Sequence, residues 1–485
     1  MRQSRVFAGI ALAFALAGCA TLVTNEPRNL PVTSVAQAAE SGREEATYDD
    51  ELLVGVSFSG GGTRAAAFAH GALLEIDRTA IPSAAGPVSL LDKLDFVSGV
   101  SGGAITAAYY GLKKRAALAD FRERFLLRNA EEAITTDITL GNISRALAGG
   151  INDTEKFPRW LDANLFEGAT FAEFRAQRRP RIWINASDIY NRTTFVFGAT
   201  AFRAICSDLN SYPIANAVAA SAAVPVVFAP VVIKSYPQAC NSKLPEWVVR
   251  ARDDHNSPPM LQAFASAISR YNAGEVPYIK LLDGGLVDNF GLSGFTIARL
   301  SSNTAYGPMT QAQAVKLRRA LFIVVDAGRG PSGDWVKTLE GPGGIDLIMA
   351  ASDTAVDSSV RASFTAFDRT TSEWQSALIR WRCGLSAAER KKYGAPANWN
   401  CRDVKFFVGR VGFDALDDAR AAQLQAIATR FKLPESQVDA LIAAGGDALR
   451  VNPAFRGFVG SLGRGAPRLR PPAAHVASAM EPVAE

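Results

Sequence analysis

A serine framed by glycines is the first candidate for chemistry. The segment Gly99-Val100-Ser101-Gly102-Gly103 has the pattern G-x-S-x-G and lies between an apolar run at 94–98 and a segment of helical composition at 104–112. Strand, turn and helix in this order are the setting of a nucleophile elbow, in which small neighbours let the chain turn sharply and present the hydroxyl. The helix N-terminus favours an oxyanion that develops there. The pattern indicates a nucleophile, and the alternative is a serine that caps a helix in a glycine-rich loop.

A second glycine-rich loop, Ser59-Gly60-Gly61-Gly62-Thr63-Arg64, lies earlier in the chain. Consecutive glycines let backbone N–H groups point into one cavity, as an oxyanion hole requires. A phosphate-binding loop is disfavoured, because the Walker pattern needs Gly-Lys and the sequence contains no such pair. A dinucleotide fingerprint needs glycine where Ala65 stands. Arg64 either adds a charge or fixes the loop, and the expected oxyanion hole consists of Gly60, Gly61, Gly62 and Arg64.

Histidine is the usual base for a serine nucleophile, but the chain has only three. His475 lies in an expected tail, and His255 lies in a polar segment beside prolines. His70 lies inside an expected helix, where a packing role is the default. So few histidines also disfavour a multi-histidine metal centre.

A carboxylate is therefore the better candidate for the base. The apolar run 279–282 ends in Asp283, which is followed by Gly284 and Gly285. A direct dyad of Ser101 and Asp283 fits these residues. Asp326, at the end of the run 321–325, is the second candidate, and its alternative role is structural.

Together the three segments resemble the patatin-like phospholipase family, which carries a G-G-G-x-R/K loop, a G-x-S-x-G serine and a D-G-G/A aspartate in this order. The segment Ala220-Ser221-Ala222-Ala223-Val224-Pro225 is similar to the family's A-S-x-A-x-P helix end. The resemblance covers about residues 50–330. It implies a three-layer α/β/α fold with a central, mostly parallel sheet, a serine–aspartate dyad, and neither metal nor cofactor.

The resemblance also implies a function, the hydrolysis of fatty-acyl esters of phospholipids or lysophospholipids through an acyl-enzyme. Two alternatives stay open. One is an envelope lipoprotein that binds acyl lipids without catalysis, and the presence of both Ser101 and Asp283 disfavours it. The other is a serine thioesterase or esterase that acts on substrates outside membranes.

Alternating strands and helices must position these residues. Strand–helix alternation predicts a sheet covered on both faces, with function at the carboxyl ends of its strands. The uncharged stretch Tyr212–Ile233 contains three prolines and therefore predicts a buried helix followed by extended chain, not a membrane span. The expected strands are 52–58, 94–98, 181–185, 193–197, 279–282, 321–325 and 406–413.

The expected catalytic domain spans residues 49–330 and carries insertions at about 113–180 and 234–278. The first insertion covers the active site, lies at a membrane interface, or packs on the sheet as an ordinary amphipathic segment. A C-terminal extension at 331–462 completes the domain, with helices over 415–450. Residues 463–485 are rich in Pro, Ala and Arg and are expected to be a disordered tail.

The N-terminus reads as an export signal. Two arginines precede an uncharged apolar run that is too short to span a bilayer, and Leu16-Ala17-Gly18-Cys19 resembles a bacterial lipobox. The expectation is a signal peptide over 1–18, lipidation of Cys19 and a tether over 19–48. Since Ala20 stands where Asp would retain an inner-membrane lipoprotein, the resemblance favours the outer membrane, facing the periplasm.

Composition and cysteines agree with an exported globular protein. Of the 485 residues, 48% are hydrophobic, and the formal net charge of +5 is too small to predict a nucleic-acid partner. The membrane is the expected partner, through the lipid anchor and the substrate. Four further cysteines allow two disulfides in an exported protein, and we expect sequence-local pairs, Cys206–Cys240 and Cys383–Cys401, with buried free thiols as the alternative.

Overall fold

The computed structural model describes residues 26–34, 51–83, 85–133, 155–177, 179–225, 227–240, 242–331 and 333–463. The expected signal peptide, Cys19, most of the expected tether, His475 and nearly all of the expected tail lie outside the described residues.

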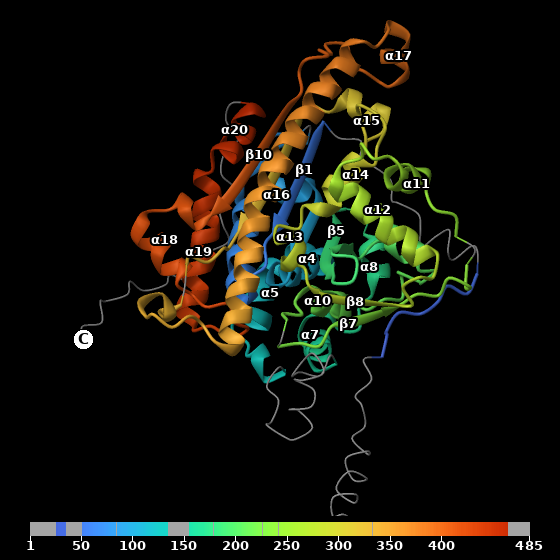
Figure 1. Ribbon diagram of the computed structural model, residues 1–485. Helices are drawn as coiled ribbons and strands as arrows, with labels where there is room; N and C mark the ends of the chain where they lie inside the picture. The colour runs from blue at the N-terminus through green and yellow to red at the C-terminus, as the bar shows by residue number, and fades with distance from the viewer. Residues whose placement is uncertain are drawn as a thin grey trace, which may run out of the picture.

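The core of the fold is a mixed eight-stranded sheet with the order β10-β9-β1-β4-β5-β8-β7, in which β6 also pairs with β5 (Figure 1). From β10 to β5 all neighbours are parallel, whereas β8 is antiparallel to both β5 and β7. The remaining two strands form a separate pair, β2 with β3. The bounds are β1 (Leu52–Phe58), β2 (Ala80–Ile81), β3 (Val88–Ser89), β4 (Leu94–Val100), β5 (Arg181–Asp188), β6 (Thr193–Val196), β7 (Val231–Lys234), β8 (Tyr278–Asp283), β9 (Arg319–Asp326) and β10 (Lys405–Gly412).

The sheet is apolar on both faces because its central strands are near-continuous hydrophobic runs. Strand β9 shows this directly. Its residues Leu321, Ile323 and Val325 join one buried cluster, and the alternate residues Ala320, Phe322 and Val324 join another. Helices cover both faces, which confirms the predicted α/β fold with a mostly parallel central sheet.

Helices α3, α4, α10, α19 and α20 pack on one face, and α14 and α16 supply the aromatic side chains that pack on the other. The helix bounds are α3 (Gly62–Arg78), α4 (Gly102–Lys113), α5 (Ala117–Phe121), α7 (Lys156–Leu161), α8 (Phe171–Ala176), α9 (Ala199–Ala204), α10 (Ile214–Ser221), α11 (Glu246–Asp253), α12 (Pro259–Asn272), α13 (Gly285–Asp288), α14 (Ser293–Leu300), α15 (Gln311–Lys316), α16 (Gly344–Cys383), α17 (Ala387–Lys392), α18 (Asp418–Gln425), α19 (Glu435–Val451) and α20 (Pro453–Ser461).

The expected insertion at 113–180 contributes to the core where the structure describes it. Phe121 and Phe125 are each 1% exposed, and the ring of Phe121 stacks on Tyr109 of α4 at 5.3 Å between centroids. The described part of this segment therefore packs against its own domain.

The region after residue 330 contributes the strand that the sequence analysis expected at 406–413 and a long helix that it did not expect. Strand β10 extends the sheet beside β9, and α16 is a helix of 40 residues, seen in orange in Figure 1. The sequence analysis assigned no helix there. A signal existed, since no Gly or Pro interrupts residues 345–383.

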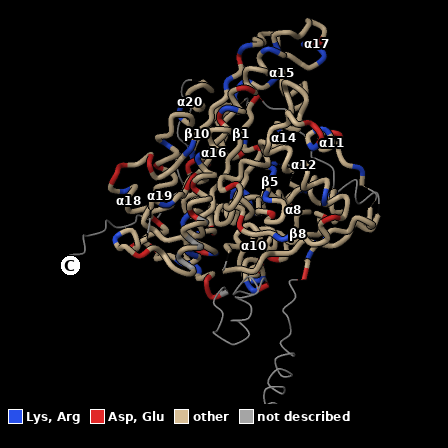
Figure 2. Tube along the Cα trace, viewed as in Figure 1, with Lys and Arg blue, Asp and Glu red and all other residues tan. Residues whose placement is uncertain are grey.

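Two disulfides join Cys206 with Cys240 and Cys383 with Cys401, which are the sequence-local pairs. In the part of the chain that the structure describes, none of the helices is both long and apolar enough to cross a membrane. Lys and Arg alternate with Asp and Glu along the trace (Figure 2), so the weak charge surplus is not gathered on one segment.

Candidate active site

The turn at Ser101 has the geometry of a nucleophile elbow. Strand β4 ends at Val100 and α4 begins at Gly102, and between them Ser101 has φ 51° and ψ −123°. A non-glycine residue held at positive φ raises the free energy of the folded state by about 1–3 kcal/mol, and contacts in the surrounding fold must offset this strain. Glycines make the turn possible, because a Cβ at Gly99 would lie 2.5 Å from the oxygen of Gly103, and one at Gly103 would lie 2.5 Å from the oxygen of Phe58.

Asp283, the last residue of β8, lines the same cavity as Ser101. The carboxylate accepts the backbone N–H of Gly285 at 2.8 Å. Burial raises the pKa of the Asp283 carboxyl to about 6, and the N–H of Gly285 and the hydroxyl of Ser101 oppose that rise. A carboxylate with a pKa near 6 is ionised at neutral pH and is basic enough to accept a proton from a serine during attack.

The end of α10 holds both members of this pair. Ser221 Oγ accepts the N–H of Ser101 at 2.9 Å and donates to the carbonyl of Asn185 at 2.6 Å. The carbonyl of Ala223 accepts the N–H of Asp283 at 2.8 Å. The A-S-x-A-x-P segment, which the sequence analysis noted without a role, therefore fixes the distance between Ser101 and Asp283.

The glycine loop between β1 and α3 faces the same place, but its amides are not equivalent. The N–H of Gly60 donates to the carbonyl and the side-chain oxygen of Asn289, at 3.2 and 3.1 Å. The amides of Gly61 and Gly62 have no protein acceptor among the described residues. Their φ angles are +138° and +58°, which only glycine adopts without strain.

Arg64 fixes this loop. Its Nε donates to the carbonyl of Ala327 at 2.9 Å and its Nη1 to that of Ile427 at 2.7 Å, and the side chain is 3% exposed. Burial, helped by nearby Arg329, lowers the pKa of the guanidinium to about 9. Of the two roles considered for Arg64, these contacts show the structural one.

The other candidate bases have different partners. Asp326 forms an ion pair with Arg410 at 2.9 Å and accepts the N–H of Gly328, so the structural alternative fits it. His70 is buried beside the ring of Phe121, and burial lowers its pKa to about 4. His255 is exposed between α11 and α12.

A cavity of about 710 Å³ opens over Ser101 and Asp283, within the size range of pockets that enclose organic ligands. Its floor is the glycine loop and the dyad. Residues of α16 between 350 and 357 line one side of the cavity. The 113–180 insertion contributes Glu131 to the lining. The apolar wall consists of Val224, Pro225, Val227, Phe228, Leu286, Trp335, Val356 and Phe431, and the charged rim of Glu131, Arg329, Asp353, Asp357 and Arg430.

Comparisons with known proteins agree with this geometry. The family model described as patatin-like phospholipase matches residues 56–296, a segment that contains the glycine loop, Ser101 and Asp283. No curated protein matches the chain.

Solved structures of human GIVD cytosolic phospholipase A2, alone and in complex with methyl gamma-linolenyl fluorophosphonate, are similar at TM-scores of 0.39 and 0.37. Both share 12% sequence identity with this chain and cover 88% of it, and the alignment spans 62% of the length of that protein. The segment that the family model matches contains the residues that form the floor of the active-site cavity. The chain contains a domain of the patatin-like phospholipase family, which spans residues 56–296.

Proposed function

We propose that the protein hydrolyses fatty-acyl esters of phospholipids or lysophospholipids through a Ser101–Asp283 dyad. The observation that carries the proposal is the placement of Ser101 and a buried carboxylate, Asp283, in the lining of one apolar cavity, inside the segment that the family model matches. An apolar wall suits an acyl chain, and the strained serine presents its hydroxyl to the ester.

The first half of the reaction forms an acyl-enzyme. Asp283 accepts the hydroxyl proton while Ser101 Oγ bonds to the ester carbonyl carbon. The amides of Gly61 and Gly62 donate to the oxyanion, since the amide of Gly60 is held by Asn289. The bond to the alcohol oxygen then breaks, and the proton on Asp283 passes to that oxygen.

The second half releases the fatty acid. Water attacks the acyl-enzyme carbonyl and gives a proton to Asp283, and the bond between the carbonyl carbon and Ser101 Oγ breaks. The proton on Asp283 then returns to Ser101, so that the free enzyme is restored and the fatty acid leaves.

A membrane location belongs to the same proposal. The sequence Leu16-Ala17-Gly18-Cys19 supports lipidation of Cys19, with the protein held at the outer membrane facing the periplasm. When bacterial cells that express the full chain are grown with a labelled fatty acid, the exported protein should carry the label. The Cys19→Ser variant should lack it. Label retained by Cys19→Ser would refute the anchor.

The test of the activity is fatty-acid release by the full chain from vesicles of phosphatidylethanolamine and phosphatidylglycerol, beside soluble short-chain esters and thioesters. We expect release from vesicles and a loss of at least about 10³-fold in Ser101→Ala, because no other nucleophile replaces the serine. Ser461→Ala, at the end of α20, is the control and should keep full activity.

The alternatives predict different results. Hydrolysis of soluble esters without release from vesicles would favour an esterase or thioesterase on substrates outside membranes. Acyl-lipid binding without hydrolysis of any substrate would favour the non-catalytic lipoprotein. Equal hydrolysis by the wild type and Ser101→Ala would refute the dyad.

A further inference from the structure

A second cavity, of about 620 Å³, lies at the opposite end of the sheet from Ser101. Its lining includes residues at the beginnings of three parallel strands, Leu52 of β1, Asp95 of β4 and Arg181 of β5, whereas Ser101 follows the last residue of β4. The sheet therefore separates the two cavities. The mechanism above uses none of the residues that line the second one.

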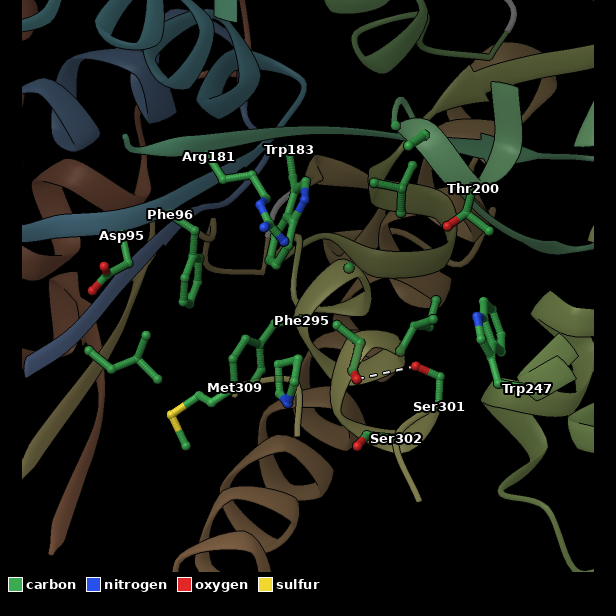
Figure 3. A pocket seen from close by; sticks show the side chains of 18 of the residues that line it. Asp95, Phe96, Arg181, Trp183, Thr200, Trp247, Phe295, Ser301, Ser302 and Met309 are labelled. Atoms are coloured by element: carbon green, nitrogen blue, oxygen red, sulfur yellow. Dashed lines mark hydrogen bonds between the residues drawn. The ribbon is translucent and has the colours of Figure 1, made fainter. Parts of the chain in front are cut away.

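Two aromatic groups form the walls of the second cavity. Phe96 packs between Trp183 and Phe295, with centroids 5.2 and 5.3 Å away, and Trp247 stacks on Phe264 at 6.3 Å. Figure 3 shows Trp247 across the cavity from Phe96, with Met309 beside Phe295. Aromatic and thioether surfaces of this kind favour an apolar ligand, and the volume lies in the range of small-molecule pockets.

The same cavity contains cations. Arg181 and Arg203 line it together with one carboxylate, Asp95. Asp95 forms an ion pair with Arg179 at 3.0 Å and accepts the N–H of Val54 at 2.7 Å, so its charge is compensated.

Arg203, on α9, is half-buried, and in the described part of the chain its guanidinium has no ion pair and no hydrogen-bond acceptor. A half-buried cation without a partner, at an apolar cavity, favours an anionic ligand. The aromatic walls thus favour a hydrocarbon chain, and Arg203 favours an anionic group at one end of that chain.

We propose that this cavity binds one long-chain fatty acid, with its carboxylate at Arg203 and its chain between the two aromatic groups. A fatty alcohol or a neutral ester would leave the guanidinium without an anion. A diacyl phospholipid would bring two chains to a cavity of single-ligand size. The site goes beyond the proposed hydrolysis and does not depend on Ser101.

The Cys206–Cys240 disulfide supports the shape of this cavity. Cys206 lies two residues after the end of α9, which carries Arg203, and Cys240 lies shortly before Pro245 and Trp247. The bond therefore links the segment that supplies the cation to the segment that supplies one aromatic wall. The 234–278 insertion thereby contributes one aromatic wall of the second cavity.

The experiment is photolabelling of the full chain with a long-chain fatty acid that carries an aliphatic diazirine, followed by peptide mapping. We expect labels between residues 181 and 203 or between 294 and 309. Palmitate should compete for these labels about tenfold better than hexadecanol, which corresponds to one charge-assisted hydrogen bond. Arg203→Gln should remove this preference, and Arg456→Gln, an exposed arginine on α20, should keep it.

A second variant fills the space instead of removing the charge. Ala298→Phe places a ring into the cavity from α14 and should abolish the labels there, while a thermal melt reports whether the variant is folded. Labels confined to residues of the active-site cavity, or labels at 181–203 or 294–309 that both variants leave unchanged, would overturn the proposal. Vesicle hydrolysis is measured in parallel, so a failure of this site is distinguished from a failure of the proposed function.

Discussion

The two cavities lie at opposite ends of one sheet and are built in different ways. The floor of the cavity over Ser101 depends on the backbone, with a serine at positive φ, glycines whose Cβ positions are blocked, and a buried carboxylate. The cavity beside Arg203 is formed mostly by side chains, and its carboxyl group and the hydroxyl of Ser301 have partners within the protein. There Ser301 Oγ donates to the carbonyl of Ala298 at 3.2 Å, and Asp95 pairs with Arg179.

This difference separates the requirements of chemistry from those of binding. A reaction needs a strained nucleophile, free amides and a desolvated base within hydrogen-bond reach, which close backbone packing provides. Binding of an amphipathic anion needs an apolar volume and one cation. Substitutions should therefore divide into those that affect hydrolysis alone and those that affect fatty-acid binding alone.

The largest expected effect is that of Asp283→Asn. The amide keeps the size of the side chain but cannot accept the serine proton, so kcat for vesicle hydrolysis should fall about 10³-fold or more. Photolabelling of the Arg203 cavity should not change. If kcat fell by less than tenfold, Asp283 would not be the base, and Asp326→Asn would be the next variant to measure.

The next effect is that of Gly62→Ala. A Cβ at Gly62, which has φ +58°, would lie 2.6 Å from the carbonyl of Arg430, so the loop must move. Displacing an oxyanion donor should lower kcat about 10²-fold. The matched control is Gly86→Ala, which has φ +110° and no atom within 4 Å. Equal losses in both variants would indicate backbone strain alone.

The pH profile is expected to show a smaller effect. Burial raises the pKa of Asp283 to about 6, and catalysis needs the ionised carboxylate. We expect kcat/KM to be constant above that pH and to fall about tenfold per pH unit below it. Fatty-acid labelling, measured over the same range, should not follow this curve. A hydrolysis profile that stays flat down to pH 4 would exclude a base with a raised pKa.

The smallest effect is expected from the disulfides. Replacing Cys206 and Cys240 by serine should weaken fatty-acid labelling about threefold to tenfold, because the wall is held less firmly, with vesicle hydrolysis within about twofold of wild type. The matched control replaces Cys383 and Cys401, a disulfide at the end of α16 and away from either cavity lining. Equal weakening by both pairs of replacements would indicate a global effect on stability.

The sequence predicted most of the sheet, because apolar runs report strands locally. The expected strand 52–58 coincides with β1, and the expected strand 321–325 lies within β9. It also predicted that Ser101 and Asp283 stand at strand ends, where a parallel sheet gathers function. Helix α16 was missed although no Gly or Pro interrupts residues 345–383, because the sequence analysis followed motifs and this segment contains none. Its packing beside the active-site cavity gives it a role that only the structure shows.

By itself, the sequence determined the order of the motifs and the glycines that permit positive φ, because each depends on residue type and near neighbours, whereas it left the cysteine pairing as one expectation among alternatives. Only the tertiary structure decided that Asn289 holds the amide of Gly60, that Arg64 anchors the loop to distant carbonyls, and that the Arg203 cavity exists. The physical reason is that these features join residues far apart in the chain, whose meeting depends on how the layers pack.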